Sequence, residues 1–115
     1  MHELSIALSI LDIAAEEAQR QGLAKVVAIH LKLGPLAGVV KEALLSAFEL
    51  AREGSAMPCV ELMVEEVPVV AYCRRCESEQ PTASMQELFC SQCGTPAAEL
   101  VHGDELEIVG LEVEA

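Results

Sequence analysis

The pair Cys73-Arg-Arg-Cys76 and Cys90-Ser-Gln-Cys93, separated by thirteen residues, decides how the second half of this chain folds. Each C-x-x-C turn can point two sulfurs at one ion, and two such turns supply the four corners of a tetrahedron. Gly94 directly follows the last cysteine and eases the tight turn that presents its sulfur. The spacing therefore predicts a tetrathiolate zinc site. Because four thiolates leave no open coordination position, we expect this zinc to be structural.

Disulfide bonds and a redox-active C-x-x-C are the alternatives for these cysteines. The first residues lack the basic region of a signal peptide, so we expect a reducing, cytoplasmic location, which argues against disulfides. Two copies without a thioredoxin-like context favour a closed metal site over a redox motif. The fifth cysteine, Cys59, is predicted to be a small buried residue at the start of a strand.

Two stretches upstream have helical periodicity. The first runs from Leu4 to Gln21 and ends before Gly22. Its predicted apolar stripe consists of Leu4, Leu8, Leu11, Ala15 and Ala18, with Ala7, Ile10 and Ala14 beside it. The second covers residues 40–52, with Leu44, Leu45, Phe48 and Ala51 turned inward.

Alternating apolar residues predict strands at residues 25–33 and 60–65 and at the end of the chain. The segment Val67 to Tyr72 leads into the first C-x-x-C pair. We predict an α+β fold in which two helices pack on a small three-stranded mixed sheet, with an inserted zinc-ribbon-like module. The expected boundaries are 1–67 and 104–115 for the α+β domain and 68–103 for the zinc-binding module.

The charge of the chain limits its partners. Seven Lys and Arg against nineteen Asp and Glu give a net charge of −12. Such a surface repels phosphate backbones, which argues against nucleic-acid binding. The sequence also lacks an apolar run long enough to cross a membrane.

The N-terminus offers a second metal site. The Met1 amine, the deprotonated His2 amide, a ring nitrogen of His2 and the Glu3 backbone nitrogen can form fused chelate rings in one plane. Square-planar nitrogen donors suit Ni(II) or Cu(II) rather than Zn(II) or Mg(II). The alternative is a disordered terminus with an incidental histidine. Composition alone favours the disordered terminus, because the motif is too short to establish a metal site unaided.

Several motifs together resemble the HypA/HybF family of hydrogenase nickel-incorporation proteins. They are the opening Met1-His2-Glu3-Leu4-Ser5, the segment Leu33-Gly34-Pro35-Leu36, the helix 43–49 ending in Arg52-Glu53-Gly54-Ser55, the paired C-x-x-C, and the closing Gly103-Asp104-Glu105-Leu106. The likeness runs from the first residue to the last. Many zinc ribbons share the cysteines, whereas Met-His-Glu at residue one together with them is specific.

The resemblance implies a non-enzymatic metallochaperone that carries Ni(II) to the large subunit of [NiFe] hydrogenase. By this resemblance Met1, His2 and Glu3 bind nickel, with His2 the essential ligand, and Cys73, Cys76, Cys90 and Cys93 bind zinc. It also implies a HypB-type GTPase as partner and, in some organisms, urease accessory proteins. The loop Pro35-Leu36-Ala37-Gly38 often carries a serine in this family, and none of its side chains here can ligate nickel.

Two further histidines and two further classes of function stay open. His30 is predicted to be a solvated or lightly paired surface residue. His102 is predicted to be a plain loop residue, with a further nickel donor or a domain-contact residue as the alternatives. A zinc-ribbon interaction module without nickel chemistry is the second class of function. An enzyme is the third, although no nucleophile–base pair or phosphate-binding loop supports it.

Overall fold

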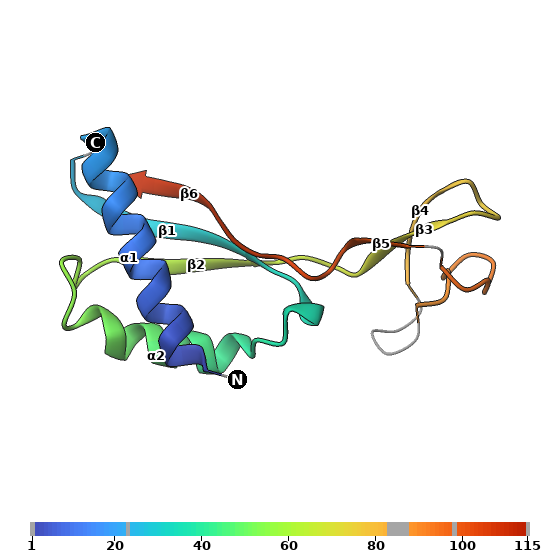
Figure 1. Cartoon of the computed structure of the whole chain (residues 1–115), viewed down its shortest axis with the longest axis horizontal. Coiled ribbons are helices and arrows are strands. Elements are labelled where there is room, and N and C mark those ends of the chain that lie inside the picture. The colour runs from blue at the N-terminus through green and yellow to red at the C-terminus, as the bar shows by residue number, and fades with distance from the viewer. Residues whose placement is uncertain (1, 23, 83–87, 98, 115) are drawn as a thin grey trace. The chain divides into compact units, whose positions relative to one another are not determined.

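The computed structural model describes residues 2–22, 24–82, 88–97 and 99–114 (Figure 1). The chain forms two compact units. The first, here called the helical unit, consists of Met1–Lys32, Val39–Glu65 and Glu107–Ala115. The second, here called the cysteine unit, consists of Leu33–Gly38 and Glu66–Leu106 and contains both C-x-x-C pairs.

A mixed sheet and two helices build the helical unit. The helices are α1 (Glu3–Gln21) and α2 (Lys41–Arg52), which pack against each other. The sheet has the order β2-β1-β6, from β2 (Glu61–Glu66), β1 (Val26–Leu33) and β6 (Leu106–Val113). In Figure 1, β2 runs in the same direction as β1, and β6 runs in the opposite direction. This arrangement confirms the predicted α+β fold with a mixed sheet.

The apolar stripe of α1 differs from the prediction. The buried residues are Ala7, Ile10, Leu11 and Ala14, whereas Leu4 and Leu8 are exposed. All four buried residues belong to the predicted apolar set, but three of them were predicted beside the stripe, so α1 is rotated toward its small residues. Alanines allow a close approach of α1 to its neighbours, and larger leucines are left on the surface. As predicted, α1 ends at Gly22, which adopts a left-handed conformation.

The core of the helical unit is aliphatic apart from one aromatic ring. Phe48 and Leu44 of α2, Ile29 and Leu31 of β1, and Val60 before β2 are almost completely buried. The predicted inward residues Leu44, Phe48 and Ala51 are confirmed, and Leu45 is half-buried. This core holds α1 and α2 without any metal ligand.

The prediction for Cys59 is wrong. Cys59 is exposed, and the buried residue is its neighbour Val60. The strand β2 begins only at Glu61, so Cys59 lies in the turn that precedes it. The alternation within β2 is as predicted, with Leu62 buried and Met63 exposed.

A second, antiparallel sheet builds the cysteine unit. Its order is β4-β3-β5, from β4 (Ser78–Pro81), β3 (Val70–Cys73) and β5 (Glu99–His102). The sequence analysis did not predict β4 or β5 as strands. Their sequences lack apolar alternation, because neither strand has to bury a continuous apolar face.

The loop after β1 fits closely against the cysteine unit's last turn. The Gly34 N–H donates to the Glu105 carbonyl at 2.8 Å, and the Leu36 N–H donates to the Gly103 carbonyl at 2.7 Å. A Cβ atom on Gly34 would collide with the Gly103 carbonyl, so only glycine fits there. Among the described residues, no helix is long and apolar enough to cross a membrane.

Candidate metal centre

The first C-x-x-C pair lies in the hairpin between β3 and β4. Cys73 is the last residue of β3 and lies opposite Ser78, so Cys76 falls in the turn between the strands. The Cys76 N–H points back and donates to the Cys73 sulfur at 3.4 Å. Glu77 takes a left-handed conformation, with φ of 53°. The turn therefore brings both sulfurs to the same side of the hairpin.

The second pair lies in an independent tight turn. The Gly94 N–H donates to the Cys90 carbonyl, and the Cys90 N–H donates to the Thr95 carbonyl, each at 2.9 Å. Gly94 has a φ of 75°, which agrees with the predicted turn. The Gln92 N–H donates to the Cys90 sulfur at 3.4 Å. Both cysteine turns thus use backbone N–H groups to orient a sulfur.

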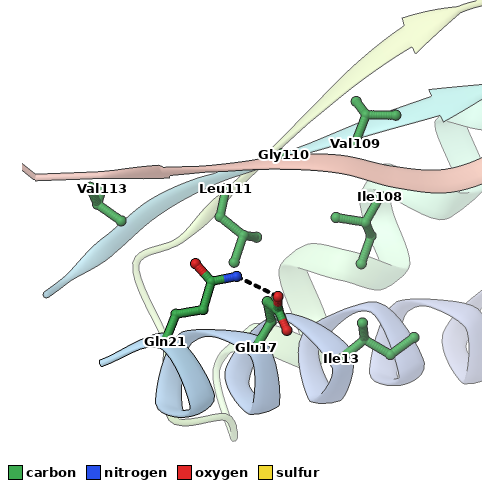
Figure 2. A pocket seen from close by; sticks show the side chains of 9 residues that line it. Ile13, Glu17, Gln21, Ile108, Val109, Gly110, Leu111 and Val113 are labelled. Atoms are coloured by element: carbon green, nitrogen blue, oxygen red, sulfur yellow. Dashed lines mark hydrogen bonds between the residues drawn. The ribbon is translucent and has the colours of Figure 1, made fainter. Parts of the chain in front are cut away.

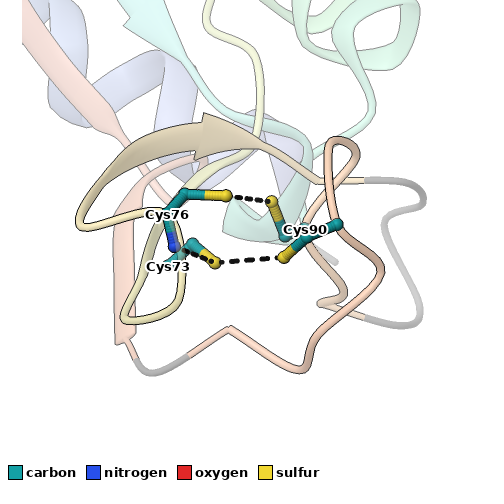
Figure 3. Close-up of side chains that lie close together, drawn as sticks. Cys73, Cys76 and Cys90 are labelled. Atoms are coloured by element: carbon teal, nitrogen blue, oxygen red, sulfur yellow. Dashed lines mark hydrogen bonds between the residues drawn. The ribbon is translucent and has the colours of Figure 1, made fainter.

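The four sulfurs converge on one point (Figure 3). All four Sγ atoms lie within 4.8 Å of one another. The Cys73 and Cys93 sulfurs are 3.5 Å apart, and the Cys76 and Cys90 sulfurs are 3.8 Å apart. A tetrahedral ion with metal–sulfur bonds of about 2.3 Å places its sulfurs about 3.8 Å apart. The residues therefore fit a tetrathiolate metal ion, and all four thiols are free rather than disulfide-bonded.

The electrostatics of the cluster favour a cation. Hydrogen bonds with the Thr95 hydroxyl and backbone N–H lower the pKa of the Cys93 thiol to about 6. The neighbouring sulfurs, first that of Cys93, raise the pKa of the Cys76 thiol to about 12. One sulfur thus ionises easily and makes its neighbour harder to ionise. A bound cation would remove this repulsion and allow all four to be thiolates.

The four cysteines are partly buried. Cys73 and Cys90 are buried, whereas Cys76 and Cys93 are half-buried. No fifth protein donor is grouped with the four sulfurs among the described residues. A closed set of four identical ligands is typical of structural sites rather than catalytic ones.

The N-terminal residues lie at the start of α1. His2 is exposed and is the N-cap residue, and its side chain makes no capping hydrogen bond. The helix begins at Glu3, so the backbone nitrogens of His2 and Glu3 precede the first intrahelical donor. Met1 lies outside the described residues.

Glu3 connects the start of α1 to the start of α2. Its Oε2 atom accepts a hydrogen bond from the Val40 N–H at 3.3 Å. Val40 is the N-cap residue of α2 and has no capping side chain of its own. Glu3 therefore satisfies a free N–H of the second helix and fixes the position of the first.

The other two histidines both pair with carboxylates. His30 Nε2 lies 3.2 Å from Glu112 Oε1 on β6, which confirms a lightly paired surface residue. His102 Nδ1 lies 2.9 Å from Glu105 Oε2. His102 ends the strand β5, so the prediction of a plain loop residue is wrong.

Two residues of the cysteine unit were missed by the sequence analysis. Thr95 contacts the Cys93 sulfur at 3.2 Å, and its position two residues after the last cysteine was the available signal. Glu105 accepts a hydrogen bond from the Gly103 N–H at 2.7 Å, which is the main reason that its pKa is lowered. Nothing in the local pattern distinguishes Glu105 from the other acidic residues of the chain.

Comparison with known proteins agrees with the motifs. The family model described as "Hydrogenase/urease nickel incorporation, metallochaperone, hypA" matches residues 1–113. The hydrogenase maturation factor HypA of Chloroflexus aurantiacus is 45% identical over 112 residues, which are 97% of this chain and 98% of the relative. The HypA of Roseiflexus sp. is 42% identical over 114 residues, covering 99% of this chain and 93% of the relative.

Solved structures share the fold. The solution structure of the Ni metallochaperone HypA from Helicobacter pylori has a TM-score of 0.68 and 24% identity, and covers 100% of this chain and 99% of that one. A second solution structure, of a HypA protein, has a TM-score of 0.71 and 23% identity over 99% of this chain and 97% of that one. The family match, the relatives and the shared fold lead to one conclusion: the chain belongs to the HypA family of hydrogenase maturation factors and nickel metallochaperones.

Proposed function

We propose that the protein binds Ni(II) through Met1, His2 and Glu3 and delivers it for the maturation of [NiFe] hydrogenase. The observation that carries this proposal is the start of α1. The helix begins one residue after His2, which leaves the imidazole exposed and two adjacent backbone nitrogens without an intrahelical acceptor. These are the donors that a planar nickel chelate requires.

The backbone, rather than the carboxylate, is the proposed contribution of Glu3 to the nickel site. The carboxylate is 3.3 Å from the Val40 N–H, so it can hold the start of α1 in place while the Glu3 nitrogen binds the ion. Amine, amide and imidazole donors must lose protons to bind. Nickel affinity should therefore fall as the pH drops, which gives a delivery protein a route to release.

The cysteine cluster is proposed to hold a structural zinc ion. Cys73, Cys76, Cys90 and Cys93 match its preference for four thiolates, and the sulfur separations of 3.5 and 3.8 Å fit its bond length. Residues 68–103 then form the zinc-binding module, and 1–67 with 104–115 form the nickel-binding domain.

The proposed partners follow from the delivery role. They are a HypB-type GTPase, the large subunit of [NiFe] hydrogenase and urease accessory proteins. We place the protein in the cytoplasm and expect no turnover of its own, because neither metal site is proposed to hold a substrate for chemistry. The charge of −12 makes nucleic acid an unfavourable partner.

Isothermal titration with Ni(II) tests the proposal. The wild-type chain, untagged and with its metal content measured beforehand, should contain one zinc and bind one nickel. His2→Ala should abolish stoichiometric nickel binding and leave the zinc content and helix content unchanged, because His2 is exposed and caps nothing with its side chain.

His30→Ala is the matched control. It also removes one surface imidazole, yet His30 lies in β1 and pairs with Glu112. Nickel binding should survive in this variant. Equal loss of nickel binding in both variants would refute the chaperone proposal for this chain. A wild-type chain that binds zinc but no nickel at neutral pH would also refute it, and would favour a zinc-ribbon interaction module without nickel chemistry.

A further inference from the structure

The strand β6 forms an edge of the sheet in the helical unit. In the order β2-β1-β6, it is hydrogen-bonded to β1 and has no described neighbour on its other side. The Glu114 N–H donates to the Lys25 carbonyl at 2.9 Å, toward β1. The backbone groups of the preceding residue, Val113, therefore point away from β1, because successive residues alternate along a strand. An extended chain can add to this edge.

A groove lined mostly by apolar side chains, with Glu17 and Gln21 at one end, lies beside this edge. It has a volume of about 480 Å³ and lies between α1 and β6. Figure 2 shows Ile108, Leu111 and Val113 pointing from β6 toward α1, where Ile13 faces them. Ile13 is 54% exposed, although it is one of the larger apolar residues of α1. A strand added to β6 would place every second side chain in this groove.

The opposite face of the same edge is acidic. Glu112 lies between Leu111 and Val113, which point toward α1 (Figure 2), so alternation places its side chain on the opposite face, and it contacts His30. Glu114, next to Val113, and Glu107, next to Ile108, point away from the groove by local alternation. The alternation shifts by one residue at Val109-Gly110, because Ile108 and Leu111 both point toward α1 while Val109 points away (Figure 2). All three carboxylates belong to exposed residues. The face away from the groove therefore carries three exposed carboxylates beside Val109, and the groove face is mostly apolar.

We propose that β6 and its groove bind an extended basic segment of a partner protein, in which apolar residues alternate with Lys or Arg. The apolar side chains enter the groove against Ile13, and the cationic side chains lie beside Glu107, Glu112 and Glu114. Opposite charges on neighbouring strands stabilise such a pair, and backbone hydrogen bonds to the β6 edge supply the rest. This site uses no metal ligand, so it stands apart from nickel binding.

A second copy of the chain is the poorer occupant of this edge. Two β6 strands side by side would bring two rows of glutamates together, and like charges across neighbouring strands repel. The net charge of −12 adds to this repulsion. Charge complementarity thus selects a basic partner over self-association.

The test uses the full chain, loaded with zinc, and a labelled synthetic peptide. The peptide is about eight residues long and alternates valine with lysine, which matches the length of an ordinary strand. Fluorescence anisotropy should show binding that weakens with added salt. In 1H–15N spectra the peptide should shift the signals of Leu111 and Val113. A peptide alternating valine with glutamate should not bind.

Two matched variants separate the groove from general charge effects. Ile13→Lys adds a positive charge inside the groove and should raise the Kd of the basic peptide about tenfold or more. Leu8→Lys makes the same change on the same helix at a residue that is 47% exposed and does not line the groove. It should change the Kd less than about twofold.

Three results would overturn the proposal. They are equal weakening by both variants while their helix content stays unchanged, equal affinity for the acidic peptide, and no binding of the basic peptide by the wild-type chain. Each of these can occur whether or not nickel binds at the N-terminus, so the two proposals fail independently.

Discussion

The helical unit and the cysteine unit are stabilised by different means. The helical unit buries Phe48, Leu44, Ile29, Leu31 and further apolar residues between its helices and sheet. Among the described residues of the cysteine unit, only Leu33, Val69 and Ala71 are buried apolar residues besides Cys73 and Cys90. A core of that size supplies little folding free energy, and we expect a metal ion bound by the four cysteines to supply the rest. The two units therefore differ in how much of their stability an apolar core can supply.

Loss of the cysteine-bound metal should produce the largest effect. Cys90→Ser removes a buried ligand, and a structural zinc site accounts for about 10–16 kcal/mol of apparent binding free energy in isolated fingers. We expect the cysteine unit to unfold while the helical unit keeps its signals in 1H–15N spectra. Cys59→Ser, at the exposed cysteine, is the control and should leave both units folded. Loss of the helical signals in Cys90→Ser would show that the two units are not stabilised separately.

Truncation of the aromatic core residue should produce the opposite pattern. Phe48→Ala should destabilise the helical unit by about 3–5 kcal/mol, because the ring is 2% exposed and leaves a cavity. The zinc content, measured by atomic emission, should not change. Leu50→Ala on the same helix changes an exposed side chain and should cost far less in chemical denaturation. If Phe48→Ala also releases zinc, the cysteine unit depends on the apolar core.

A substitution at Gly34 should weaken the cysteine unit without touching a metal ligand. In Gly34→Ala, the added Cβ meets the backbone of Gly103, which cannot move aside as a side chain can. We expect a loss of about 1–3 kcal/mol in the stability of this unit. Gly54→Ala has nothing within 4 Å of the added atom and serves as the control. Equal thermal unfolding of the two variants would argue against the close approach.

The smallest effect should come from Glu105. Its pKa is lowered chiefly by the Gly103 N–H, so the ionised carboxylate stabilises the folded unit above the pKa of the unfolded chain. That contribution is lost as the pH falls through the folded-state pKa. Glu105→Gln should therefore be slightly less stable than the wild type at pH 7. The two should converge once the pH has fallen below the lowered folded-state pKa of Glu105. A difference that persists unchanged at low pH would exclude ionisation as the cause.

The accuracy of the sequence predictions follows the same division between the units. In the helical unit, apolar periodicity predicted both helices and the sheet, because burial on one side of each element leaves that pattern in the sequence. In the cysteine unit, β4 and β5 left no such pattern, since Ser78–Pro81 pairs through its backbone alone. The cysteine cluster was nevertheless predicted in full, because ligand spacing reports metal geometry directly.

The errors came from residues whose positions depend on tertiary contacts. The centre of the α1 stripe was shifted because small and large apolar residues satisfy the same period, and only packing selects Ala7 and Ala14, predicted beside the stripe, over Leu4 and Leu8. The prediction placed Cys59 at the start of a strand, whereas β2 begins two residues later, at Glu61. Contacts such as that of Glu3 with Val40 join residues far apart in the sequence, so no local sequence pattern predicts them.

The most direct test of the central claim is a nickel titration of two versions of the full chain. One has its native N-terminus, and the other carries a single additional glycine before Met1, verified by mass spectrometry. The extension keeps every side chain and leaves both folded units intact, but it moves the terminal amine away from His2. We predict one tightly bound Ni(II) for the native chain and loss of that binding after extension, with one zinc in both. Equal nickel binding by the two versions would contradict a chelate built on the N-terminal amine and backbone.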